Sequence, residues 1–409
     1  MKEFNIPSFY RSTIISKVKE KRKLADPRKK DFSPSLLDFG KVQFWIPRHF
    51  GFCYGVENAI ELSYKAIEEN PDTRIFLLSQ MIHNPGVNED LRNHGIKFIQ
   101  DTAGRQIIPW EELDSEDIVI IPAFGTTVEI EGKLNEIGVQ TKAYNTTCPF
   151  VEKVWNRAEK LGEDKYTVVI HGKHLHEETR ATFSHSRQNS NSIIVKDLKE
   201  AGTLADYILG KSTEEEFLMA FKGKYSEGFD PKKDLRKIGV VNQTTMLATE
   251  TQAITDFLRG TMITKYGDMN IKNHIADTRD TLCYATNDNQ NATKGLLDVI
   301  ADFAIVVGGY NSSNTTHLVE LMENKFPCYF IEDESKLISA TEWLSYDIHQ
   351  NMEVKARVNL NNKNIMKIII SSGASCPDST VDRVIQRILE LKKVRTTAEE
   401  ALETMAFGL

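Results

Sequence analysis

Three of the five cysteines of the chain lie in short segments that read as loops. They are Cys53 in Gly51-Phe52-Cys53-Tyr54-Gly55, Cys148 in Asn145-Thr146-Thr147-Cys148-Pro149, and Cys283 in Leu282-Cys283-Tyr284-Ala285-Thr286. A structural cysteine is usually a small apolar residue inside an apolar run, whereas glycine, proline and hydroxyl side chains surround these three. Thiolates are soft metal ligands, so three of them brought to one point would hold a metal ion or a cluster with one open position.

The spacing of the cysteines favours an iron–sulfur cluster over zinc. Structural zinc usually takes four ligands from close C-x-x-C pairs, and catalytic zinc favours histidine and carboxylate ligands. A cuboidal cluster accepts thiolates from separate parts of a chain. The alternative is a set of unrelated buried thiols, and Cys328, at the start of an apolar strand, and Cys376, beside Pro377, fit that alternative. Cys376 is kept as a spare ligand.

Two further segments combine hydroxyl and amide groups with an expected helix start. Asn311-Ser312-Ser313-Asn314 follows Gly308-Gly309, and Ser375 precedes Pro377 and a helical pattern. Free N–H groups at a helix start suit an anion, most simply a phosphate. The alternative for either segment is an ordinary helix cap. No Walker loop and no G-x-G-x-x-G motif is present, so a nucleotide is not indicated.

The segment 171–180 is rich in side chains that could bind or protonate a substrate. It contains His171, Lys173, His174, His176 and Arg180 beside Glu177 and Glu178. We interpret it as a diphosphate clamp with a carboxylate proton donor beside it. The alternative is a solvated polar face. His83, in His83-Asn84-Pro85-Gly86, would on its own be a surface or capping residue.

The elements that must position these residues alternate between strands and helices. Short apolar, mostly β-branched runs are expected to form strands at 42–46, 74–78, 118–121, 167–170, 238–241, 303–307, 328–331 and 368–370. Amphipathic patterns predict helices over 56–67 and 381–391, the second capped by Asp378 or Ser379. This rhythm predicts an α/β protein with parallel sheets, whose ligands bind beyond the carboxyl ends of the strands.

Composition excludes several classes of protein. A length of 409 residues suggests two or three domains, and the net charge of −7 argues against general nucleic-acid binding. No apolar stretch has the length of a membrane span, and the start lacks the apolar core of a secretory signal. Five cysteines do not make a disulfide framework, so we expect a reducing, cytoplasmic location. The charged residues 1–41 are expected to be a peripheral extension, and 200–236 an inserted helical excursion.

An ordered set of motifs carries a resemblance to a known family. The set is Gly51-Phe52-Cys53-Tyr54-Gly55-Val56, Ile82-His83-Asn84, Pro122-Ala123-Phe124-Gly125, Thr147-Cys148-Pro149, His176-Glu177-Glu178-Thr179, Asn242-Gln243-Thr244-Thr245, Cys283-Tyr284-Ala285-Thr286, Asn311-Ser312-Ser313-Asn314 and Gly373-Ala374-Ser375. It resembles the 4-hydroxy-3-methylbut-2-enyl diphosphate reductases, in the longer form of cyanobacteria and plastids, over roughly residues 42–393. These enzymes catalyse the last step of the methylerythritol phosphate route to isoprenoids.

The resemblance implies an α/β fold of three similar lobes, with small and mostly parallel sheets, around a central iron–sulfur cluster. In this numbering the expected parts are an N-terminal extension at 1–41, a first lobe at 54–147, a second lobe at 148–282 with the insertion 200–236, a third lobe at 42–53 plus 283–394, and a C-terminal tail at 395–409.

The resemblance also implies the chemistry. The activity would be reductive dehydroxylation of (E)-4-hydroxy-3-methylbut-2-enyl diphosphate to isopentenyl and dimethylallyl diphosphate, with ferredoxin or flavodoxin as electron donor. Cys53, Cys148 and Cys283 would hold a [4Fe–4S] cluster with one iron that no cysteine binds. Glu178 would donate the proton and Thr244 would assist its relay. The diphosphate would be held by His83, His176, Ser312, Ser313, Asn314 and Ser375.

Two departures from the family pattern bear on this assignment. Phe124 stands where many members have a histidine, so we expect Lys173 or Arg180 to replace the missing cation. The segment 174–178 also has two registers, and Glu177 is the fallback proton donor. The alternative functions are an iron–sulfur hydro-lyase, which consumes no reductant, a cluster-carrying redox protein, which binds no diphosphate, and a non-catalytic zinc protein, which contains no iron or sulfide.

Overall fold

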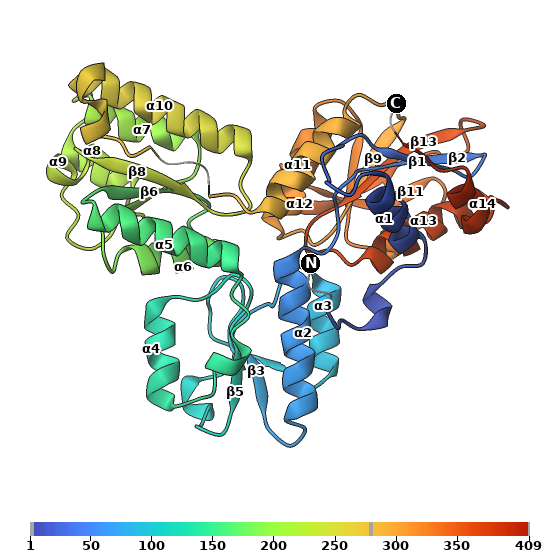
Figure 1. The fold of residues 1–409 in the computed structure, drawn as a ribbon, viewed down its shortest axis with the longest axis horizontal. Helices are drawn as coiled ribbons and strands as arrows, with labels where there is room; N and C mark the ends of the chain where they lie inside the picture. The colour runs from blue at the N-terminus through green and yellow to red at the C-terminus, as the bar shows by residue number, and fades with distance from the viewer. Residues whose placement is uncertain (1–3, 278–280, 408–409) are drawn as a thin grey trace. The chain divides into compact units, whose positions relative to one another are not determined.

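A computed structural model describes residues 4–277 and 281–407 of the chain. The chain divides into two compact units. Unit 1 comprises Met1–Glu57, His83–Val87 and Tyr284–Leu409, and unit 2 comprises Asn58–Ile82 and Asn88–Cys283. Each unit combines helices with small, mostly parallel sheets, which confirms the expected α/β class (Figure 1).

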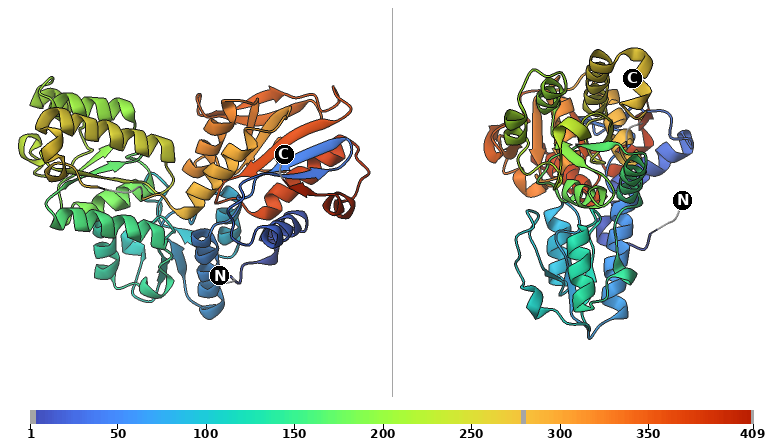
Figure 2. Two further views of the ribbon diagram at one scale, coloured as in Figure 1. Left: turned by 45° about the horizontal axis from the view of Figure 1, so that its top comes forward. Right: turned by 90° about the vertical axis from the view of Figure 1, so that its left-hand side faces the viewer.

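Unit 1 is built on a six-stranded sheet in the order β10-β9-β13-β2-β1-β14. The strands are β1 (Ser35–Asp38), β2 (Val42–Ile46), β9 (Phe303–Val307), β10 (Cys328–Ile331), β13 (Met366–Ser372) and β14 (Ala406–Phe407). The four strands from β10 to β2 are parallel, and β1 is antiparallel to both of its neighbours. An antiparallel pair, β11 (Glu342–Asp347) and β12 (Met352–Arg357), is separate from this sheet. The N-terminal strands therefore lie beside the C-terminal ones (Figure 2).

Helices cover both faces of this sheet. They are α1 (Ile14–Ala25), α11 (Tyr284–Leu296), α12 (Ser313–Glu323), α13 (Asp378–Leu391) and α14 (Ala398–Glu403). Successive side chains of a strand point to opposite faces. Accordingly, Ile305 of β9 packs in one core with α1, α13 and α14, whereas Val306 packs in a second core with α11 and α12. Burial on both faces explains why the strands are continuously apolar in sequence.

Much of the segment 4–40 is packed into unit 1, contrary to the sequence-based expectation that it is peripheral. Ile15 and Val18 of α1 are buried in the main core of unit 1. The strand β1, which begins at Ser35, is part of the six-stranded sheet. The charged residues of this segment obscure the apolar pattern, because all of those in α1 except the buried Arg22 lie at least partly exposed. The C-terminal segment is likewise packed, since Ala401 of α14 is buried in the same core.

Unit 2 contains two three-stranded parallel sheets, ordered β4-β3-β5 and β7-β6-β8. Their strands are β3 (Ile75–Leu77), β4 (Lys97–Phe98), β5 (Ile118–Ile120), β6 (Thr167–His171), β7 (Ser192–Val195) and β8 (Ile238–Asn242). The helices are α4 (Val128–Ile137), α5 (Pro149–Glu163), α6 (Glu177–Ser186), α7 (Leu198–Ile208), α8 (Glu214–Ala220), α9 (Pro231–Asp234) and α10 (Ala248–Tyr266). The segment 200–236 is helical, as expected, and Phe217 within it is fully buried in the core of the second sheet.

The remaining elements complete the chain. Two helices have residues in both units, α2 (Tyr54–Glu69) and α3 (Pro85–Asn93). Short 3-10 helices lie at Ser8–Tyr10, Trp110–Glu112, Lys142–Tyr144, Asp268–Asn273 and Glu334–Lys336. All eight strands expected from sequence form, whereas β1, β4, β7, β11, β12 and β14 were not foreseen. None of the helices within 4–277 and 281–407 is long and apolar enough to cross a lipid bilayer.

One helix start differs from the prediction. The expected cap of α13 was the side chain of Asp378 or Ser379, but the N-cap is Pro377, and it makes no side-chain cap bond. Asp378 lies inside the first turn and forms an ion pair with Lys19 of α1, with 2.7 Å between Oδ1 and Nζ. A carboxylate in the first turn is also favoured by the helix dipole. Asp378 thus ties α13 to α1.

Candidate active site

Each of the three cysteines directly precedes the first residue of a helix. Cys53 precedes α2, Cys148 is the N-cap of α5, and Cys283 precedes α11. All three are reduced and partly buried. Helix starts carry a partial positive charge, which favours a thiolate over a thiol. The loop setting inferred from sequence is therefore a set of three helix starts.

Unit 2 brings Cys148 and Cys283 into electrostatic range of one another and of Glu178. The pKa of Cys148 is raised to about 11, mainly by burial and in part by the charges on Cys283 and Glu178. Three groups that each ionise to an anion therefore share one region, which a bound cation would stabilise. Cys53 belongs to unit 1.

Among the described residues, no three His, Cys, Asp or Glu side chains are arranged to hold a single metal ion. The ligands of a cuboidal cluster bind different irons, so their sulfur atoms need not converge on one point. The donor chemistry, three free thiols at helix starts, fits an iron–sulfur cluster better than it fits a lone ion.

Glu178 is almost completely buried in the first turn of α6, and Thr244 holds its carboxyl group. The N–H of Thr244 donates to Oε1 of Glu178, and the Thr244 hydroxyl donates to Oε2 at 2.9 Å. These two bonds favour the carboxylate, but desolvation is the larger effect and raises the pKa of Glu178 to about 7. A carboxyl with this pKa can hold and release a proton near neutral pH.

A backbone hydrogen bond connects Thr244 to a cysteine. The N–H of Cys283 donates to the carbonyl of Thr244 at 3.3 Å. Next to it, the Asn242 Oδ1 accepts both the N–H and the hydroxyl of Thr281 at 2.8 Å. The loop after β8 therefore fixes the proton-holding carboxyl and one thiol together. Asn242 was noted in sequence only as part of a motif.

His176 is the N-cap of α6, and the hydrogen bond that its Nδ1 accepts determines which ring nitrogen carries the proton. The N–H of Glu178 donates to Nδ1 of His176 at 3.2 Å, so a neutral His176 carries its proton on Nε2. The ring of Phe124 packs edge-on against His176, with 5.6 Å between centroids and an interplanar angle of 85°. Phe124 thus restricts the orientation of the imidazole in place of supplying a charge.

Two of the five cations expected to form a clamp in 171–180, Arg180 and His171, are bonded to other parts of the protein. The guanidinium group of Arg180 donates to the backbone carbonyls of Thr102 and Ala103, at 3.0 and 2.9 Å. His171 is fully buried at the end of β6, where its Nδ1 lies 2.9 Å from the hydroxyl of Thr251. Both side chains are engaged in holding the fold, so Arg180 does not replace the cation missing at Phe124.

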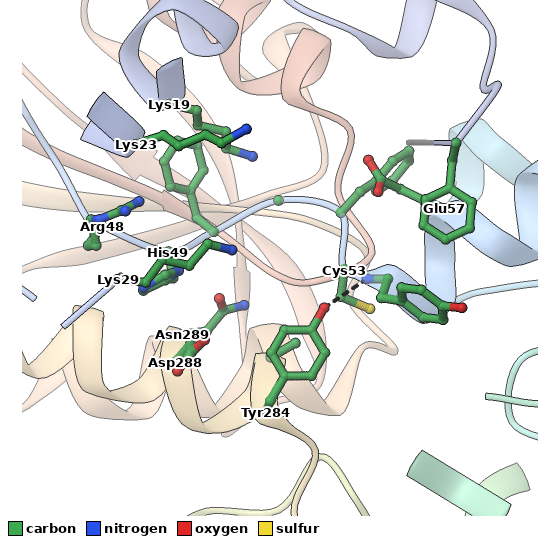
Figure 3. A pocket seen from close by; sticks show the side chains of 16 residues that line it. Lys19, Lys23, Lys29, Arg48, His49, Cys53, Glu57, Tyr284, Asp288 and Asn289 are labelled. Atoms are coloured by element: carbon green, nitrogen blue, oxygen red, sulfur yellow. Dashed lines mark hydrogen bonds between the residues drawn. The ribbon is translucent and has the colours of Figure 1, made fainter. Parts of the chain in front are cut away.

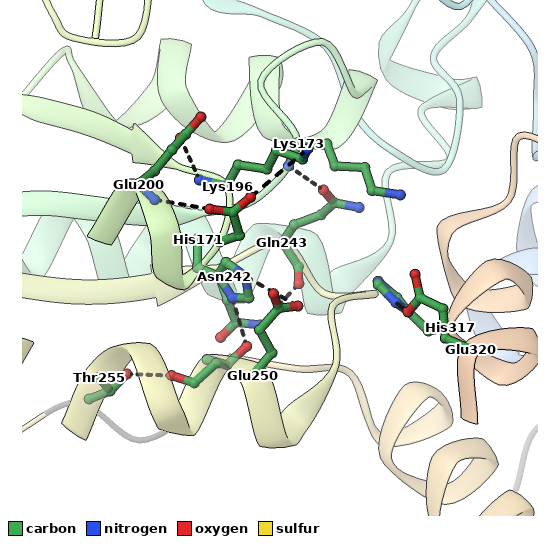
Figure 4. A network of polar contacts seen from close by, with 12 residues as sticks. His171, Lys173, Lys196, Glu200, Asn242, Gln243, Glu250, Thr255, His317 and Glu320 are labelled. Carbon is green, nitrogen blue, oxygen red and sulfur yellow. Dashed lines mark hydrogen bonds and ion pairs between the residues drawn. The ribbon is translucent and has the colours of Figure 1, made fainter. Parts of the chain in front are cut away.

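Gln243 arranges the loop that leads to Glu178. Its Oε1 accepts from the N–H of Lys173 at 3.2 Å (Figure 4). The same oxygen accepts from the hydroxyl of Thr179 at 3.0 Å. One side chain after β8 thereby fixes both ends of the turn after β6. This is a positioning role that sequence reasoning missed, although the carboxyl ends of adjacent parallel strands indicated the location.

Glu177, the fallback proton donor, points to a different partner. Its carboxyl group is buried and accepts a hydrogen bond from the hydroxyl of Ser79. Adjacent helical residues point about 100° apart, so Glu177 and Glu178 face different surroundings. Only the second of them bonds to Thr244, the residue linked to a thiol.

Unit 1 contains a pair of hydroxyl and amide loops at helix starts. Ser312 caps α12, and its Oγ accepts from the N–H of Thr315 at 3.3 Å. The Oδ1 of Asn314 accepts from the N–H of Ala374 at 2.9 Å. Both Ser313 Oγ and Asn314 Nδ2 are buried and have no hydrogen-bond partner among the described residues. Two such donors at the start of a helix fit a bound anion.

Ser375 joins this loop to His83. Its hydroxyl donates to the carbonyl of His83 at 3.1 Å and lies 3.5 Å from the hydroxyl of Ser312. A Cβ on Gly309 would lie 2.4 Å from the same carbonyl, so this close approach requires glycine. Unit 1 therefore gathers five of the six predicted substrate-binding residues: His83, Ser312, Ser313, Asn314 and Ser375. The sixth, His176, belongs to unit 2.

The loop with Cys53 is attached to the same region of unit 1. The N–H of Cys53 donates to the carbonyl of Ala374 at 3.2 Å. Gly51 has a φ of +76°, and a Cβ there would lie 2.3 Å from Oδ1 of Asp378. The tight turn before Cys53 therefore depends on a glycine packed against α13. Each unit thus holds at least one thiol beside its own set of polar residues.

Comparison with known proteins identifies the family. The model of the family described as LytB protein matches residues 45–389. The chain belongs to the LytB family. A relative from Cyanothece sp. (strain PCC 7425 / ATCC 29141), named 4-hydroxy-3-methylbut-2-enyl diphosphate reductase, is 38% identical over 94% of this chain and 90% of its own length. A relative of the same name from Synechococcus sp. (strain WH7803) is 40% identical over 87% of each chain.

Solved structures agree with the LytB assignment. A structure titled as (E)-4-hydroxy-3-methyl-but-2-enyl diphosphate reductase, the terminal enzyme of the non-mevalonate pathway, matches with a TM-score of 0.52 and 25% identity, over 84% of this chain and 98% of that one. The Plasmodium falciparum reductase matches in fold with a TM-score of 0.60 over 84% of this LytB chain and 86% of that one, at 21% identity. The resemblance inferred from the ordered motifs is confirmed.

Proposed function

We propose that the chain catalyses the reductive dehydroxylation of (E)-4-hydroxy-3-methylbut-2-enyl diphosphate to isopentenyl and dimethylallyl diphosphate, the last step of the methylerythritol phosphate route. The names of LytB relatives that cover nearly the whole chain support this reaction. The main structural support for this reaction is a series of hydrogen bonds from Glu178 through Thr244 to Cys283. Cys148 lies close enough to Cys283 and Glu178 for their charges to affect its pKa. A proton source thereby lies next to soft metal ligands.

Cys53, Cys148 and Cys283 are the proposed ligands of a [4Fe–4S] cluster. Unit 1 would supply one of these thiolates and unit 2 the other two. When bound, a cluster with one iron that lacks a cysteine ligand supplies single electrons and a Lewis-acidic metal. The positive end of each helix dipole opposes the burial that raises the pKa of Cys148, and a bound cluster would hold all three ligands as thiolates.

Glu178 is the proposed proton donor. Its raised pKa leaves the carboxyl substantially protonated at neutral pH, and its protonated form can deliver a proton to the leaving hydroxyl group. Thr244 orients the carboxyl through two donors and offers its own hydroxyl as a relay. Burial excludes bulk water from this proton.

The loops at Ser312–Asn314 and Ser375 are the proposed diphosphate site, together with His83 and His176. The hydroxyl and amide donors at the start of α12 support this, because Ser313 Oγ and Asn314 Nδ2 lack partners within the described chain. Binding of the diphosphate would contribute energy that orients the distant allylic end.

The reaction balances with two electrons and two protons. The allylic C–O bond breaks, the hydroxyl leaves as water after accepting one proton, and the second proton forms a C–H bond at one of two carbons. The electrons arrive one at a time, for which we propose ferredoxin or flavodoxin as the donor.

The test combines metal analysis with a reductant-dependent assay. Protein purified without oxygen is analysed for iron and acid-labile sulfide, then supplied with the allylic alcohol diphosphate and a chemical reductant. We expect both five-carbon diphosphates to form, with two electrons consumed per molecule. Conversion that consumes no reductant would instead indicate a hydro-lyase, and retention of the cluster without diphosphate binding would indicate a cluster carrier.

A further inference from the structure

A basic cavity in unit 1 is lined in part by the Cys53 loop, and its basic side chains have no role in the proposed chemistry. Its volume is about 240 Å³. The cationic side chains that line it are Lys19, Lys23, Lys29 and Arg48, and His49 in the same lining is neutral because burial lowers its pKa to about 4. Figure 3 shows these side chains together, with Cys53 and Tyr284 also in the lining. Only two acidic side chains, Glu57 and Asp288, belong to this lining.

The positive charge of the cavity is only partly neutralised. Lys19 pairs with Asp378 and Arg48 pairs with Asp26, at 2.7 and 3.5 Å. No ion pair within the described part of the chain involves Lys23 or Lys29, so both charges face solvent or a partner.

The charge extends beyond the cavity over one face of the N-terminal segment. Residues 14–30 contain eight Lys or Arg and two acidic residues, in a chain whose net charge is −7. We call residues 14–30 with the cavity the basic face. A local field opposite in sign to the whole chain attracts an acidic partner and orients it toward this face.

The structure anchors the basic face firmly. Asp382 of α13 caps the start of α1, accepting from the hydroxyl of Ser12 at 2.6 Å and from the N–H of Ile14 at 3.3 Å. The apolar side of α1 is buried in the core of unit 1. Lys19 and Lys23 are therefore carried by a fixed helix, as specific docking requires, and Lys29 follows its C-terminal end.

We propose that the basic face is the docking surface for the acidic one-electron carrier protein that reduces the cluster, an inference that rests on the proposed function. Cys53, a proposed cluster ligand, lines the same cavity, and the Tyr284 hydroxyl accepts the N–H of Tyr54 at 3.1 Å in this lining. A carrier bound here would lie beside one of the proposed cluster ligands.

The extent of the charge favours a protein over a small anion. A single phosphate would be satisfied by the cavity alone, whereas Arg28 and Lys30 add exposed charge outside the lining. Electron-transfer complexes are small, transient and steered by charge. Each docking oxidises the carrier by one electron, so one turnover requires two dockings.

The first test measures binding directly. Oxidised plant-type [2Fe–2S] ferredoxin is titrated into the full chain, with and without iron, at low and high salt. We expect the double variant Lys23→Glu/Lys29→Glu to weaken binding about tenfold at low salt, with a smaller loss at high salt. The matched control, Lys199→Glu/Lys222→Glu, changes the net charge equally at exposed residues of unit 2 and should bind as the wild type does.

The second test separates docking from chemistry. With ferredoxin as donor, the KM for ferredoxin of the Lys23→Glu/Lys29→Glu variant should rise about tenfold. Turnover driven by dithionite and a viologen, which need no docking, should stay unchanged, and Lys23→Arg/Lys29→Arg should behave as wild type.

Three outcomes would overturn the inference. The first is that Lys23→Glu/Lys29→Glu binds ferredoxin as the wild type does. The second is that the control variant loses as much affinity for ferredoxin. The third is that the cavity binds inorganic diphosphate specifically and that Lys23→Glu/Lys29→Glu abolishes this binding without any change in ferredoxin binding. A wild type that binds ferredoxin with this charge dependence but reduces no allylic diphosphate would refute the proposed function and leave the docking surface standing.

Discussion

At the scale of single residues, the chemistry depends on how the protein treats one buried carboxyl. Desolvation raises the pKa of Glu178, and two donors from Thr244 lower it. The balance near 7 leaves a group that can both donate a proton and recover it between turnovers. A fully exposed carboxyl would be ionised at neutral pH and a carboxyl without Thr244 would be held neutral.

Replacement of Glu178 by Gln tests the proton donor. The amide keeps the size of the side chain but cannot deliver a proton, so we expect turnover to fall by about 10²- to 10⁴-fold. Iron and sulfide content should not change, because Glu178 is not a proposed ligand. Steady-state rates with a chemical reductant, together with metal analysis, measure both quantities.

The neighbouring Glu177→Gln variant is the matched control. Glu177 bonds to Ser79, and the amide oxygen of Gln can still accept that bond. Activity should stay within a few-fold of wild type. The reverse result, an active Glu178→Gln enzyme and an inactive Glu177→Gln enzyme, would transfer the donor role to Glu177.

The pH dependence of the rate supplies a second prediction. Because the protonated form of Glu178 is the donor, turnover should be highest below about pH 7 and decline as pH rises through this pKa. Thr244→Val removes the hydroxyl that favours the carboxylate, so the decline should move to higher pH. Thr244→Ser retains the donor and should retain the wild-type profile. An unshifted profile in Thr244→Val would show that another group controls the rate.

At the scale of elements, sequence patterns located the strands and the polar loops at their ends. Short β-branched runs identified all eight expected strands, because strands buried on both faces are apolar throughout. The loops after β6, β8, β9 and β13 carry the residues of the candidate site. Paired strands such as β11 and β12 were missed, because the largely polar β12 has no comparable apolar run.

The N-terminal segment shows why contacts between distant parts of the chain could not be predicted from the sequence. Its charge run obscures Ile14, Ile15 and Val18, whose burial requires α13 as a partner. That partner lies more than three hundred residues away along the chain, and no local pattern reports such a pairing. The cap of α1 comes from the same distant helix.

Asp382→Ala tests this cap. Asp382 accepts hydrogen bonds from Ser12, Thr13 and Ile14, so its loss leaves the N–H groups of Thr13 and Ile14 without this acceptor. We expect destabilisation of about 1 kcal/mol and faster amide exchange in residues 12–25. Asp72→Ala, at an exposed position, is the control, and equal exchange in both variants would contradict the cap.

Removal of residues 1–35 tests the segment as a whole. The deletion would remove the buried side of α1 and the start of β1, and with them apolar contacts in the core of unit 1. We therefore expect a lower Tm and loss of the wild-type fold in unit 1. Thermal unfolding followed by circular dichroism measures this, and a deletion variant with unchanged Tm would restore the peripheral interpretation.

At the scale of the whole molecule, sequence motifs identified the family, but the roles of individual residues needed coordinates. The ordered motifs indicated which loops belong together, and the comparisons confirm the LytB family. Sequence could not distinguish Arg180, which holds backbone carbonyls, from a substrate-binding cation. It also could not show that Gln243 and Asn242 arrange the two loops that carry Glu178 and Cys283.

The iron content of variants at each of the five cysteines tests the proposed ligands in both units. Cys53→Ser in unit 1 and Cys148→Ser or Cys283→Ser in unit 2 should each lower iron and sulfide severely, because a cluster that retains two thiolates is labile. Cys328→Ala should retain the full cluster. Cys376 is fully buried in the core of unit 1, so Cys376→Ser should lower the Tm without loss of iron.

If Cys376→Ser loses iron at a temperature where its circular dichroism remains native, Cys376 is a ligand and the assignment of three thiolates is wrong. If Cys53→Ser keeps its iron, the cluster belongs to unit 2 alone, and the proposed docking of the carrier beside a cluster ligand fails with it.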